Sequence, residues 1–564
     1  MTNNIGLDFG TSYTVVSRLK NMEKNKKGEM ISLDLEACLP NEGALSPYQD
    51  SVVLRNPNGT LTFGPLTRAE TGRKGMLVYK GFKMMLAETD QDVLTKRGYD
   101  ETYTPEYIVK KYLDDILHRY IDMSNLEENR IDKVVIGVPE IWFSDASTIN
   151  CRTLLESIVS SFPYVNQVEL VSEPAAACAF FVFNYKKNIE RRYKGKILLV
   201  DYGGGTLDIA LCDVHENGQS SEVSVIKRCG AGLNEEGFIG KAGMAFIEAA
   251  VKLALKPLGL DDKEILENRK FYVCVNFVED ALMNKMKDIR DTFGSDELTD
   301  RSTLDDVFCT IEFGEDNMLD LTYGMLATAY NQIIQPVLDE KLDEIIEYME
   351  NNDINYLYSE LDDFKIAPVG GFCNFYLTQE QIEKKFGRYT KDKRFIDIIT
   401  DRRDCEKAVS YGASLIANEI IEFKQLSPYH LGIARGSERE IRDIYYAIHK
   451  GDDIVYDKPI FIQAEDGEEI LFQGANIPLL VVNIDDNCSD SYLLWDKPLK
   501  EYKKAFKLDL TKCYKIGFSL DRSMIITLHK HVIDLETNTT VEKSSERLND
   551  IYSIIGNLFV VRGA

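Results

Sequence analysis

Two stretches of the chain place a carboxylate, glycines and a threonine directly after an apolar run. The first is IGLDFGTSYT, residues 5–14, and the second is ILLVDYGGGTLDIALCDV, residues 197–214. Each pattern predicts a strand, a glycine turn and a returning strand. Glycines let backbone N–H groups approach phosphate oxygens closely, and the hydroxyls add further donors. Each stretch therefore predicts a hairpin that binds the phosphate end of a nucleotide.

The two hairpins are predicted to act together. The distance in sequence between Asp8 and Asp201 is too long for a solenoid repeat, so it indicates two lobes that hold one ligand between them. Asp8 and Asp201 are expected to hold Mg²⁺ through its waters, because Mg²⁺ prefers carboxylate, water and phosphate oxygens. Thr11, Ser12 and Thr206 are candidate hydroxyl donors. For either hairpin alone, an ordinary tight turn in an antiparallel sheet remains the alternative.

Composition excludes several classes of protein. The 564 residues predict three or four structural units, and no apolar run is long enough to cross a bilayer. The formal charge of −26 opposes nucleic acid and anionic lipid as main partners. No leader sequence and no C-x-x-C pair is found, so a cytoplasmic protein with reduced cysteines is expected. Walker and Rossmann glycine motifs are also missing, which disfavours those folds.

Five further segments follow in a characteristic order: YTPEYIVKKYLDDILHRY, KVVIGVPEIWF, QVELVSEPAAACAFF, FKIAPVGGFCNFY and EKAVSYGASLIANEII. They are predicted to be a helix with a Thr104-Pro105 start, a strand ending at Pro139, a strand leading into a small-residue helix, a strand breaking at Gly-Gly, and a helix over 406–421. Together with the hairpins they resemble the nucleotide-binding domain of the actin, sugar kinase and heat-shock chaperone superfamily. Within it, the resemblance is to the seventy-kilodalton heat-shock chaperone (DnaK-type) family.

The resemblance implies a fold and a domain order. Residues 1–422 are expected to form an α/β actin-like ATPase domain with two duplicated ribonuclease-H-like lobes. A short linker, 423–430, is expected to lead to a β-sandwich substrate domain over 431–564. That domain is predicted to end in a short amphipathic helix over 544–558, without the family's helical lid.

The resemblance also implies site roles. Asp8 and Asp201 match residues that hold hydrated Mg²⁺, and Lys83, Glu173, Asp201 and Thr206 match the catalytic set. Lys83 would neutralise charge on the transferred phosphoryl group; the alternative is a solvated lysine beside Lys80. The implied ATP or ADP contacts are Gly10, Thr11, Ser12, Tyr13, Gly203, Gly204, Gly205, Thr206, Gly230, Arg290, Gly370, Gly371, Phe372 and Glu406.

Several positions depart from the family pattern. Phe372 and Asn374 stand where the family has a serine and an adenine-stacking arginine, and Arg290 replaces a lysine near the ribose. Thr148 replaces an arginine of the interdomain relay, and the linker is shortened. His529 and His531 flank Lys530 in a strand-like run, but two histidines without a third ligand are more often structural.

Three functions are carried forward. The first is a DnaK-type chaperone whose ATP hydrolysis is coupled to binding of extended apolar polypeptide, with a J-domain co-chaperone and a nucleotide-exchange factor as further partners. The second is a nucleotide-regulated scaffold without general chaperone activity, which the altered linker and missing lid motivate. The third is a small-molecule kinase of the same superfamily, for which no catalytic carboxylate motif is found.

Overall fold

The computed structural model describes residues 3–548 with internal gaps. The gaps are 25–29, 41–43, 65–66, 68–69, 72, 74, 89, 125–128, 145–148, 218–219, 233–241, 269, 294–302, 315–316, 355–363, 387–405, 438–439, 465–466, 474–478, 484–492, 495–508 and 510.

By its internal contacts the chain divides into two compact units. Unit 1 comprises Met1–Ile141 and Ser157–Phe423, and unit 2 comprises Trp142–Glu156 and Lys424–Ala564. Unit 2 therefore includes a segment from the middle of the sequence, which the sequence interpretation did not anticipate.

The first sheet of unit 1 is built on the N-terminal hairpin. β1 (Asn4–Phe9) pairs antiparallel with β2 (Tyr13–Lys24) and parallel with β8 (Ile131–Val138). β3 (Met30–Ala37) and β9 (Val165–Ser172) complete the order β3-β2-β1-β8-β9, and the short β4 (Gln49–Asp50) pairs with β2. β8 is buried along nearly its whole length, as expected for a strand between two parallel neighbours.

The second sheet of unit 1 repeats this plan. β10 (Gly195–Tyr202) pairs antiparallel with β11 (Leu207–Asn217) and parallel with β15 (Phe364–Val369). β12 (Ser220–Ala231) and β16 (Glu422–Lys424) extend the sheet in the order β15-β10-β11-β12-β16. Both predicted glycine hairpins are thus confirmed as hairpins, each beside a parallel strand.

Two helices, α6 (Glu173–Ile189) and α15 (Ala408–Ala417), link the two sheets. They pack on each other, while α15 contacts β1 and β8 and α6 contacts β10 and β11. A Cβ added at Gly412 would lie 1.6 Å from the Ala176 carbonyl oxygen, so only glycine permits this approach. α15 is shorter than the predicted 406–421 helix, because it ends at Ala417 and Glu419 follows at φ 57°.

The predicted helix starts are confirmed. α3 (Pro105–Ser124) begins with proline, and the Thr104 hydroxyl accepts a hydrogen bond from the Tyr107 amide at 3.2 Å. Ser172 caps α6 by accepting from the Ala175 amide at 3.3 Å. These caps fix the point at which each chain segment turns from loop or strand into helix.

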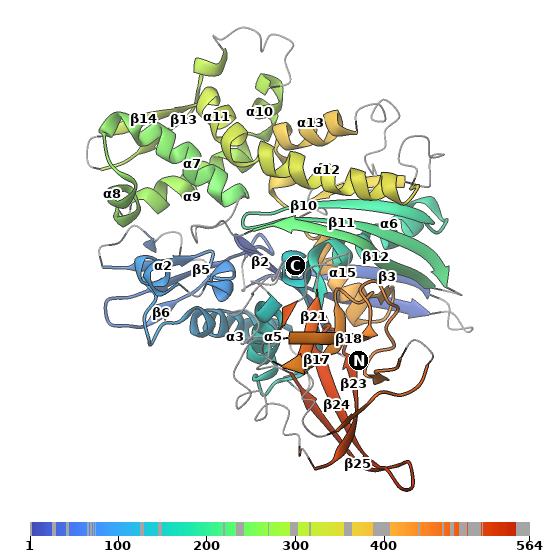
Figure 1. The fold of residues 1–564 in the computed structure, drawn as a ribbon. Coiled ribbons are helices and arrows are strands. Elements are labelled where there is room, and N and C mark those ends of the chain that lie inside the picture. Colours follow the sequence, from blue (N-terminus) through green and yellow to red (C-terminus); the bar gives the residue numbers. More distant parts are fainter. Residues whose placement is uncertain are drawn as a thin grey trace. The chain divides into compact units, whose positions relative to one another are not determined.

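The other elements of unit 1 surround the two sheets. Figure 1 shows α12 running along the β10–β11–β12 sheet, with α7, α9 and α11 grouped near it. Their bounds are β5 (Val52–Arg55), β6 (Leu61–Thr62), β7 (Leu77–Lys80), η1 (Met84–Ala87), α2 (Gln91–Lys96), α7 (Gly243–Leu255), η2 (Lys256–Leu258), α8 (Asp262–Glu267), α9 (Lys270–Asn284), α10 (Met286–Phe293), η4 (Thr303–Asp305), β13 (Val307–Glu312), β14 (Met318–Thr322), α11 (Tyr323–Ile333), α12 (Gln335–Asn351), η5 (Phe372–Asn374) and α13 (Tyr376–Lys385).

The described residues of unit 2 form two antiparallel sheets. The first has the order β18-β17-β21-β22 and the second β19-β23-β24-β25, with β20 also paired to β23. The bounds are β17 (His430–Ser437), β18 (Glu440–Ile448), β19 (Ile460–Phe461), β20 (Leu471–Gln473), β21 (Leu479–Asn483), β22 (Leu493–Leu494), β23 (Cys513–Leu520), β24 (Ile526–Asp534) and β25 (Thr539–Arg547). Packing of these sheets as a sandwich stays a prediction.

The predicted C-terminal helix is wrong where the structure describes it. Residues 544–547 form the end of β25, where Ser544 pairs with Lys530 and Arg547 with Thr527. Pairing with β24 therefore overrides the helical spacing of apolar residues in this segment. Residues 549–558 of the predicted helix lie outside the described residues.

The middle segment Trp142–Glu156 is anchored within unit 2 by polar contacts. It includes most of α4 (Ile141–Ser144) and the first part of α5 (Ile149–Ser160). Arg152 is 1% exposed and donates to the Ser523 carbonyl oxygen at 3.0 Å. Glu156 accepts bidentate hydrogen bonds from Arg547 at 2.9–3.1 Å. The position of Thr148 lies outside the described residues.

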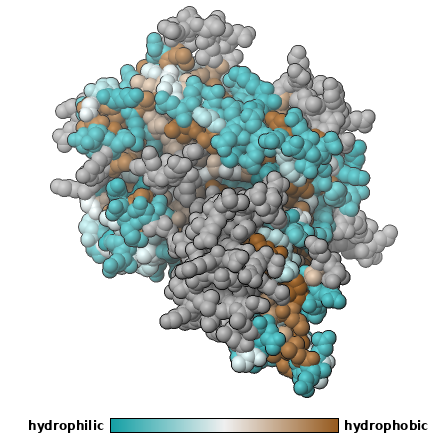
Figure 2. Space-filling view, in the orientation of Figure 1, coloured by the Kyte–Doolittle hydropathy of each residue, from teal (hydrophilic) through white to brown (hydrophobic). Residues whose placement is uncertain are grey.

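The surface and the cysteines agree with the composition. The face drawn in Figure 2 is largely hydrophilic over α12, a helix rich in Asp and Glu. The described part of the chain contains no helix with the length and apolar character needed to cross a membrane. The nine cysteines in the described part are free, and all but Cys38 are buried.

Candidate nucleotide site

A pocket of about 530 Å³ in unit 1 brings together most of the predicted site residues. Ligand pockets are typically about 300–1,000 Å³, so a nucleotide fits this volume. The predicted residues that line it are Asp8, Gly10, Thr11, Ser12, Tyr13, Lys83, Glu173, Asp201, Gly203, Gly204, Gly205, Thr206, Gly370, Gly371, Phe372 and Glu406. They come from both hairpins, from the turn before η1, from the start of α6 and from the segments after β15 and before α15.

Two of the predicted nucleotide contacts are not among the described residues that line the pocket. Gly230 lies in β12 and does not line the pocket; a Cβ there would lie 2.9 Å from the Leu207 carbonyl oxygen, behind the second hairpin. Arg290 belongs to α10, but its side chain lies outside the described residues, and the adjacent Ile289 lines the pocket instead.

The tips of the two hairpins meet at the pocket. A Cβ added at Gly205 would lie 2.3 Å from the Thr11 hydroxyl oxygen, and one at Gly204 would lie 2.5 Å from the Ser12 hydroxyl oxygen. The glycines are therefore needed for the hairpins to approach. Backbone amides and hydroxyls from both tips converge there, which is the chemistry of an anion-binding concavity.

Lys83 and Glu173 form a buried ion pair beside the hairpins. Lys83 Nζ lies 2.5 Å from Glu173 Oε1, and the two residues are 2% and 7% exposed. The solvated alternative for Lys83 is therefore wrong. Lys80 points elsewhere: it donates to Asn276 at 2.8 Å and to Glu279 at 3.0 Å on α9. Of the two lysines, only Lys83 lines the pocket.

The pocket is strongly acidic. Among the described residues, seven carboxylate residues and one lysine line it, so a polyphosphate needs a cation to bind there. Burial and the nearby Glu173 raise the pKa of Asp8 to about 7, although Lys83 opposes this. Burial, Glu173, Asp208 and Asp8 raise the pKa of Asp201 well above its ordinary value. The positive charge of Lys83 only partly offsets the burial and repulsion that disfavour the ionised forms of these carboxylates.

The donor set fits hydrated Mg²⁺. Among the described residues, no group of three or more His, Cys, Asp or Glu side chains is arranged to hold a metal directly. Asp8 and Asp201 line the same pocket, and Mg²⁺ commonly binds through one or two carboxylates together with water and substrate phosphate oxygens. These two carboxylates and the hairpin tips therefore suit a metal that arrives with a nucleotide.

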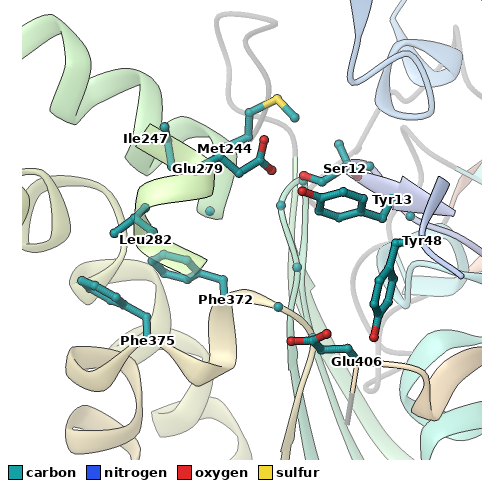
Figure 3. A pocket seen from close by; sticks show the side chains of 18 of the residues that line it. Ser12, Tyr13, Tyr48, Met244, Ile247, Glu279, Leu282, Phe372, Phe375 and Glu406 are labelled. Carbon is teal, nitrogen blue, oxygen red and sulfur yellow. The ribbon is translucent and has the colours of Figure 1, made fainter. Parts of the chain in front are cut away.

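The side of the pocket opposite the first hairpin is mostly apolar, with the Glu279 carboxylate among its apolar side chains. Figure 3 shows Met244, Ile247, Leu282, Phe372 and Phe375 on this side, facing Ser12, Tyr13 and Tyr48. Phe372 follows the turn at Gly370, whose φ of +79° and whose contact with Asp201 require glycine. The side chain of Asn374 lies outside the described residues.

Sequence reasoning missed three residues at or beside the site. Asp208 is fully buried in β11, and its Oδ1 accepts hydrogen bonds from the Glu140 and Ile141 amides at 2.6 and 3.3 Å. Glu140, also fully buried, pairs with Arg228 at 2.5 Å. Tyr48 lines the pocket and makes a hydrogen bond with Glu406; burial and Glu406 raise the pKa of Tyr48. For Asp208, the sequence did contain a signal, because a carboxylate interrupts the apolar run Leu207-Asp208-Ile209.

Parts of the chain are similar in sequence to known heat-shock proteins. Residues 72–224, which include Lys83, Glu173, Asp201 and Asp208, match the Hsp70 protein family. A heat shock protein homolog of Encephalitozoon cuniculi is 29% identical over 24% of the chain and 19% of its own length. The chaperone protein DnaK of Mycoplasmoides gallisepticum is 22% identical over 38% of the chain and 32% of its own length. A mitochondrial-type heat shock protein 70 of Encephalitozoon hellem is 25% identical over 38% of the chain and 35% of its own length.

The matched regions are partial. The matches span between about a fifth and about a third of the length of these relatives. They support an actin-like, two-lobed ATPase fold for unit 1, in keeping with its two similar mixed sheets. The family match, these three relatives and the paired hairpins together support a distant relationship between this chain and the Hsp70 family.

Proposed function

We propose that the protein binds Mg²⁺–ATP in the pocket of unit 1 and hydrolyses it slowly, as a chaperone of the DnaK type. The observation that carries this proposal is the meeting of the two glycine hairpins beside the Lys83–Glu173 pair, in a pocket of nucleotide size. The family match, which covers the second hairpin, supports it.

The roles of the side chains follow from their positions. Backbone amides of the hairpin tips and the Thr11, Ser12 and Thr206 hydroxyls would bind the phosphates. Asp8 and Asp201 would hold hydrated Mg²⁺, which supplies positive charge to the phosphate oxygens. Lys83 would neutralise charge that develops on the transferred phosphoryl group. Glu173, held by Lys83, would orient the attacking water.

Single-turnover hydrolysis of ATP tests the catalytic part. We expect slow Mg²⁺-dependent turnover in the parent protein, and a loss of at least about hundredfold in Asp201→Asn, because removing one stabilising group of this kind typically costs that much. A matched control is Asp213→Asn, which changes a carboxylate in β11 that does not line the pocket. Equal rates in Asp201→Asn and the parent would contradict the proposal.

The chaperone part concerns unit 2. We propose that its antiparallel sheets bind extended apolar polypeptide and that J-domain and nucleotide-exchange partners act on unit 1, in the cytoplasm. Fluorescence anisotropy of a labelled apolar heptapeptide, with and without ATP, tests this. A change in peptide affinity with ATP is expected. A peptide affinity that does not change with ATP would favour the second candidate, a nucleotide-binding scaffold. The departures from the family pattern at Phe372 and in the linker support this candidate.

A further inference from the structure

A group of basic residues lies at the end of α6 and in the turn that leads into β10. The stretch YKKNIERRYKGK, residues 185–196, contains six lysines and arginines and one glutamate, in a chain whose formal charge is −26. Lys186, Lys187, Arg191 and Lys194 of this stretch are exposed. We call these four residues the basic cluster. Positive charge is therefore concentrated locally on the surface of an acidic protein.

The backbone that carries the basic cluster is fixed by contacts on both sides of the turn. Glu190 follows α6 with a φ of 56°, and its amide donates to the Lys186 carbonyl oxygen at 3.0 Å. Tyr193 is 1% exposed, and its hydroxyl donates to the Lys196 carbonyl oxygen at 2.8 Å. Its ring meets the buried ring of Tyr185 edge-on, with centroids 5.2 Å apart. A partner therefore does not have to order this backbone when it binds.

Acidic groups of the fold leave much of this charge uncompensated. Among the residues that the structure describes, none forms an ion pair with Lys186, Lys187 or Lys194. Asp213, on the neighbouring strand β11, is paired with Lys196 at 3.2 Å. Three lysines of the basic cluster are therefore available to an anionic partner.

Stabilisation of the helix end explains only part of this pattern. Lys186 and Lys187 lie in the last turn of α6, where cations interact favourably with the carbonyl end of the helix. Arg191 and Lys194 lie beyond the helix, so this role does not apply to them. The buried Tyr193 anchors the turn that presents them. The four cations therefore form a larger surface feature than a helix end requires.

We propose that the basic cluster binds a short acidic segment, rich in Asp and Glu, of a partner polypeptide. The proposal rests on charge complementarity, since lysine ammonium groups attract carboxylates and the Arg191 guanidinium matches their planar geometry. Nucleic acids and anionic membranes carry charge over a much wider surface, so they would also meet the acidic remainder of this chain, whereas a short peptide meets the cluster alone. The inference goes beyond nucleotide binding and does not depend on it.

Fluorescence anisotropy of a short labelled peptide of alternating Asp and Glu residues, titrated with the full chain, tests the proposal. We expect saturable binding that weakens as salt is raised toward about 0.15 M, because exposed charges are screened. The triple variant Lys186→Gln, Lys187→Gln, Lys194→Gln should weaken binding about five- to tenfold, since three exposed ion pairs are lost and each contributes a factor of about two. Glutamine forms helices about as well as lysine, so α6 should be retained.

The matched control is the triple variant Lys96→Gln, Lys110→Gln, Lys256→Gln. It changes the net charge by the same amount but removes exposed lysines from α2, α3 and η2. This variant should bind the peptide like the parent. Equal losses in the two triple variants would overturn the inference, because the net charge of the chain would then set the affinity. Absence of peptide binding by the parent would also overturn it.

Photocrosslinking locates the site even if the cluster variant does not fold. An acidic peptide with a photoreactive group should label the parent within or beside residues 185–196, and labelling confined to other regions would overturn the inference. A single-stranded oligonucleotide or anionic vesicles that displace the peptide at lower concentration than the unlabelled peptide would assign the cluster to another class of partner and overturn it too. None of these outcomes bears on the proposed nucleotide function, because the cluster does not line the pocket.

Discussion

At the scale of single residues, the pocket of unit 1 concentrates buried charge that folding alone does not favour. Lys83 and Glu173 are paired away from water, and Asp8 and Asp201 have raised pKa values because of burial and the nearby Glu173 carboxylate. Such groups oppose folding unless a ligand supplies compensating charge, and perturbed carboxylates in a pocket are typical of functional sites.

Replacing Lys83 tests whether the buried pair serves chemistry. Lys83→Met leaves Glu173 without its partner, and we expect ATP turnover to fall by at least about hundredfold. Lys80→Met is the matched control. Lys80, like Lys83, is buried and paired with a carboxylate, and its partner is Glu279 on α9. We expect Lys80→Met to retain turnover and to release nucleotide faster, because it removes a link between β7 and α9. Stopped-flow release of a fluorescent nucleotide measures the second effect; equal turnover in the two variants would contradict the assignment.

We expect replacement of Asp8 to increase the stability of the folded protein by an amount that depends on pH. The pKa of Asp8 is about 7 in the folded protein and 3.8 for an unperturbed side chain. Because the pKa is raised in the folded protein, the ionised form of Asp8 destabilises the fold. This destabilisation increases from about pH 4 to about pH 7 and stays constant above about pH 7. In thermal unfolding measured with EDTA, the melting temperature of Asp8→Asn relative to that of the parent should increase over this pH range. A gain that is largest at acid pH would contradict the raised pKa.

At the scale of elements, the site depends on how closely the central helices pack. α6 and α15 touch through alanine and glycine, and this contact holds the first residue of α6, Glu173, beside the hairpins. The hairpins are in turn fixed by their parallel neighbours β8 and β15. Small residues at these contacts are therefore structural requirements, although they carry no chemistry.

Gly412→Val should destabilise unit 1 strongly. The first carbon of the new side chain would lie 1.6 Å from the Ala176 carbonyl oxygen, so α6 and α15 must separate. Overpacking of a core commonly costs about 1–3 kcal/mol, and a backbone clash of this size should reach or exceed about 3 kcal/mol. Urea unfolding measures the loss. Gly371→Ala, which meets no atom within 4 Å, is the control and should unfold like the parent.

At the scale of the whole molecule, the division into units does not follow the sequence. Unit 2 includes Trp142–Glu156, so the chain crosses from unit 1 to unit 2 and back before its C-terminal part begins. Within unit 2, Arg152 contacts Ser523, and Glu156 contacts Arg547, which also pairs with Asp521. The middle segment and the C-terminal strands therefore depend on each other.

A fragment of residues 1–423 should be less stable than the full chain. It would retain Arg152 and Glu156 but lose Ser523 and Arg547, leaving buried polar groups without partners. We expect limited proteolysis to cut the fragment within 142–156 faster than it cuts the full chain. Equal resistance of the fragment and the full chain would contradict this dependence. The variant Arg547→Ala in the full chain should expose the same segment to a smaller degree.

The sequence by itself determined the hairpins, the strand before Pro139, the cap of α3, the change from strand to helix at α6 and the glycine break after β15. These features depend on local rules, because glycine, proline and capping residues act on their immediate neighbours. The same locality explains why Asp8, Thr11 and Asp201 could be chosen from the hairpin motifs, whereas Lys83 and Glu173 were implied only by the resemblance to the family. Their arrangement around one pocket was a hypothesis until both sheets were in view.

Only the tertiary structure decided the rest. The apolar residues that line the pocket come from α7, α9, α10 and η5, segments that are separate in sequence and share no motif. The hydrogen bonds that Asp208 accepts from the Glu140 and Ile141 amides join segments that are separate in sequence, so only the tertiary structure revealed them. The predicted helix at 544–558 failed at its start because pairing with β24 outweighs local periodicity. Contacts between distant segments follow from packing of the whole chain, and no window of sequence contains that information.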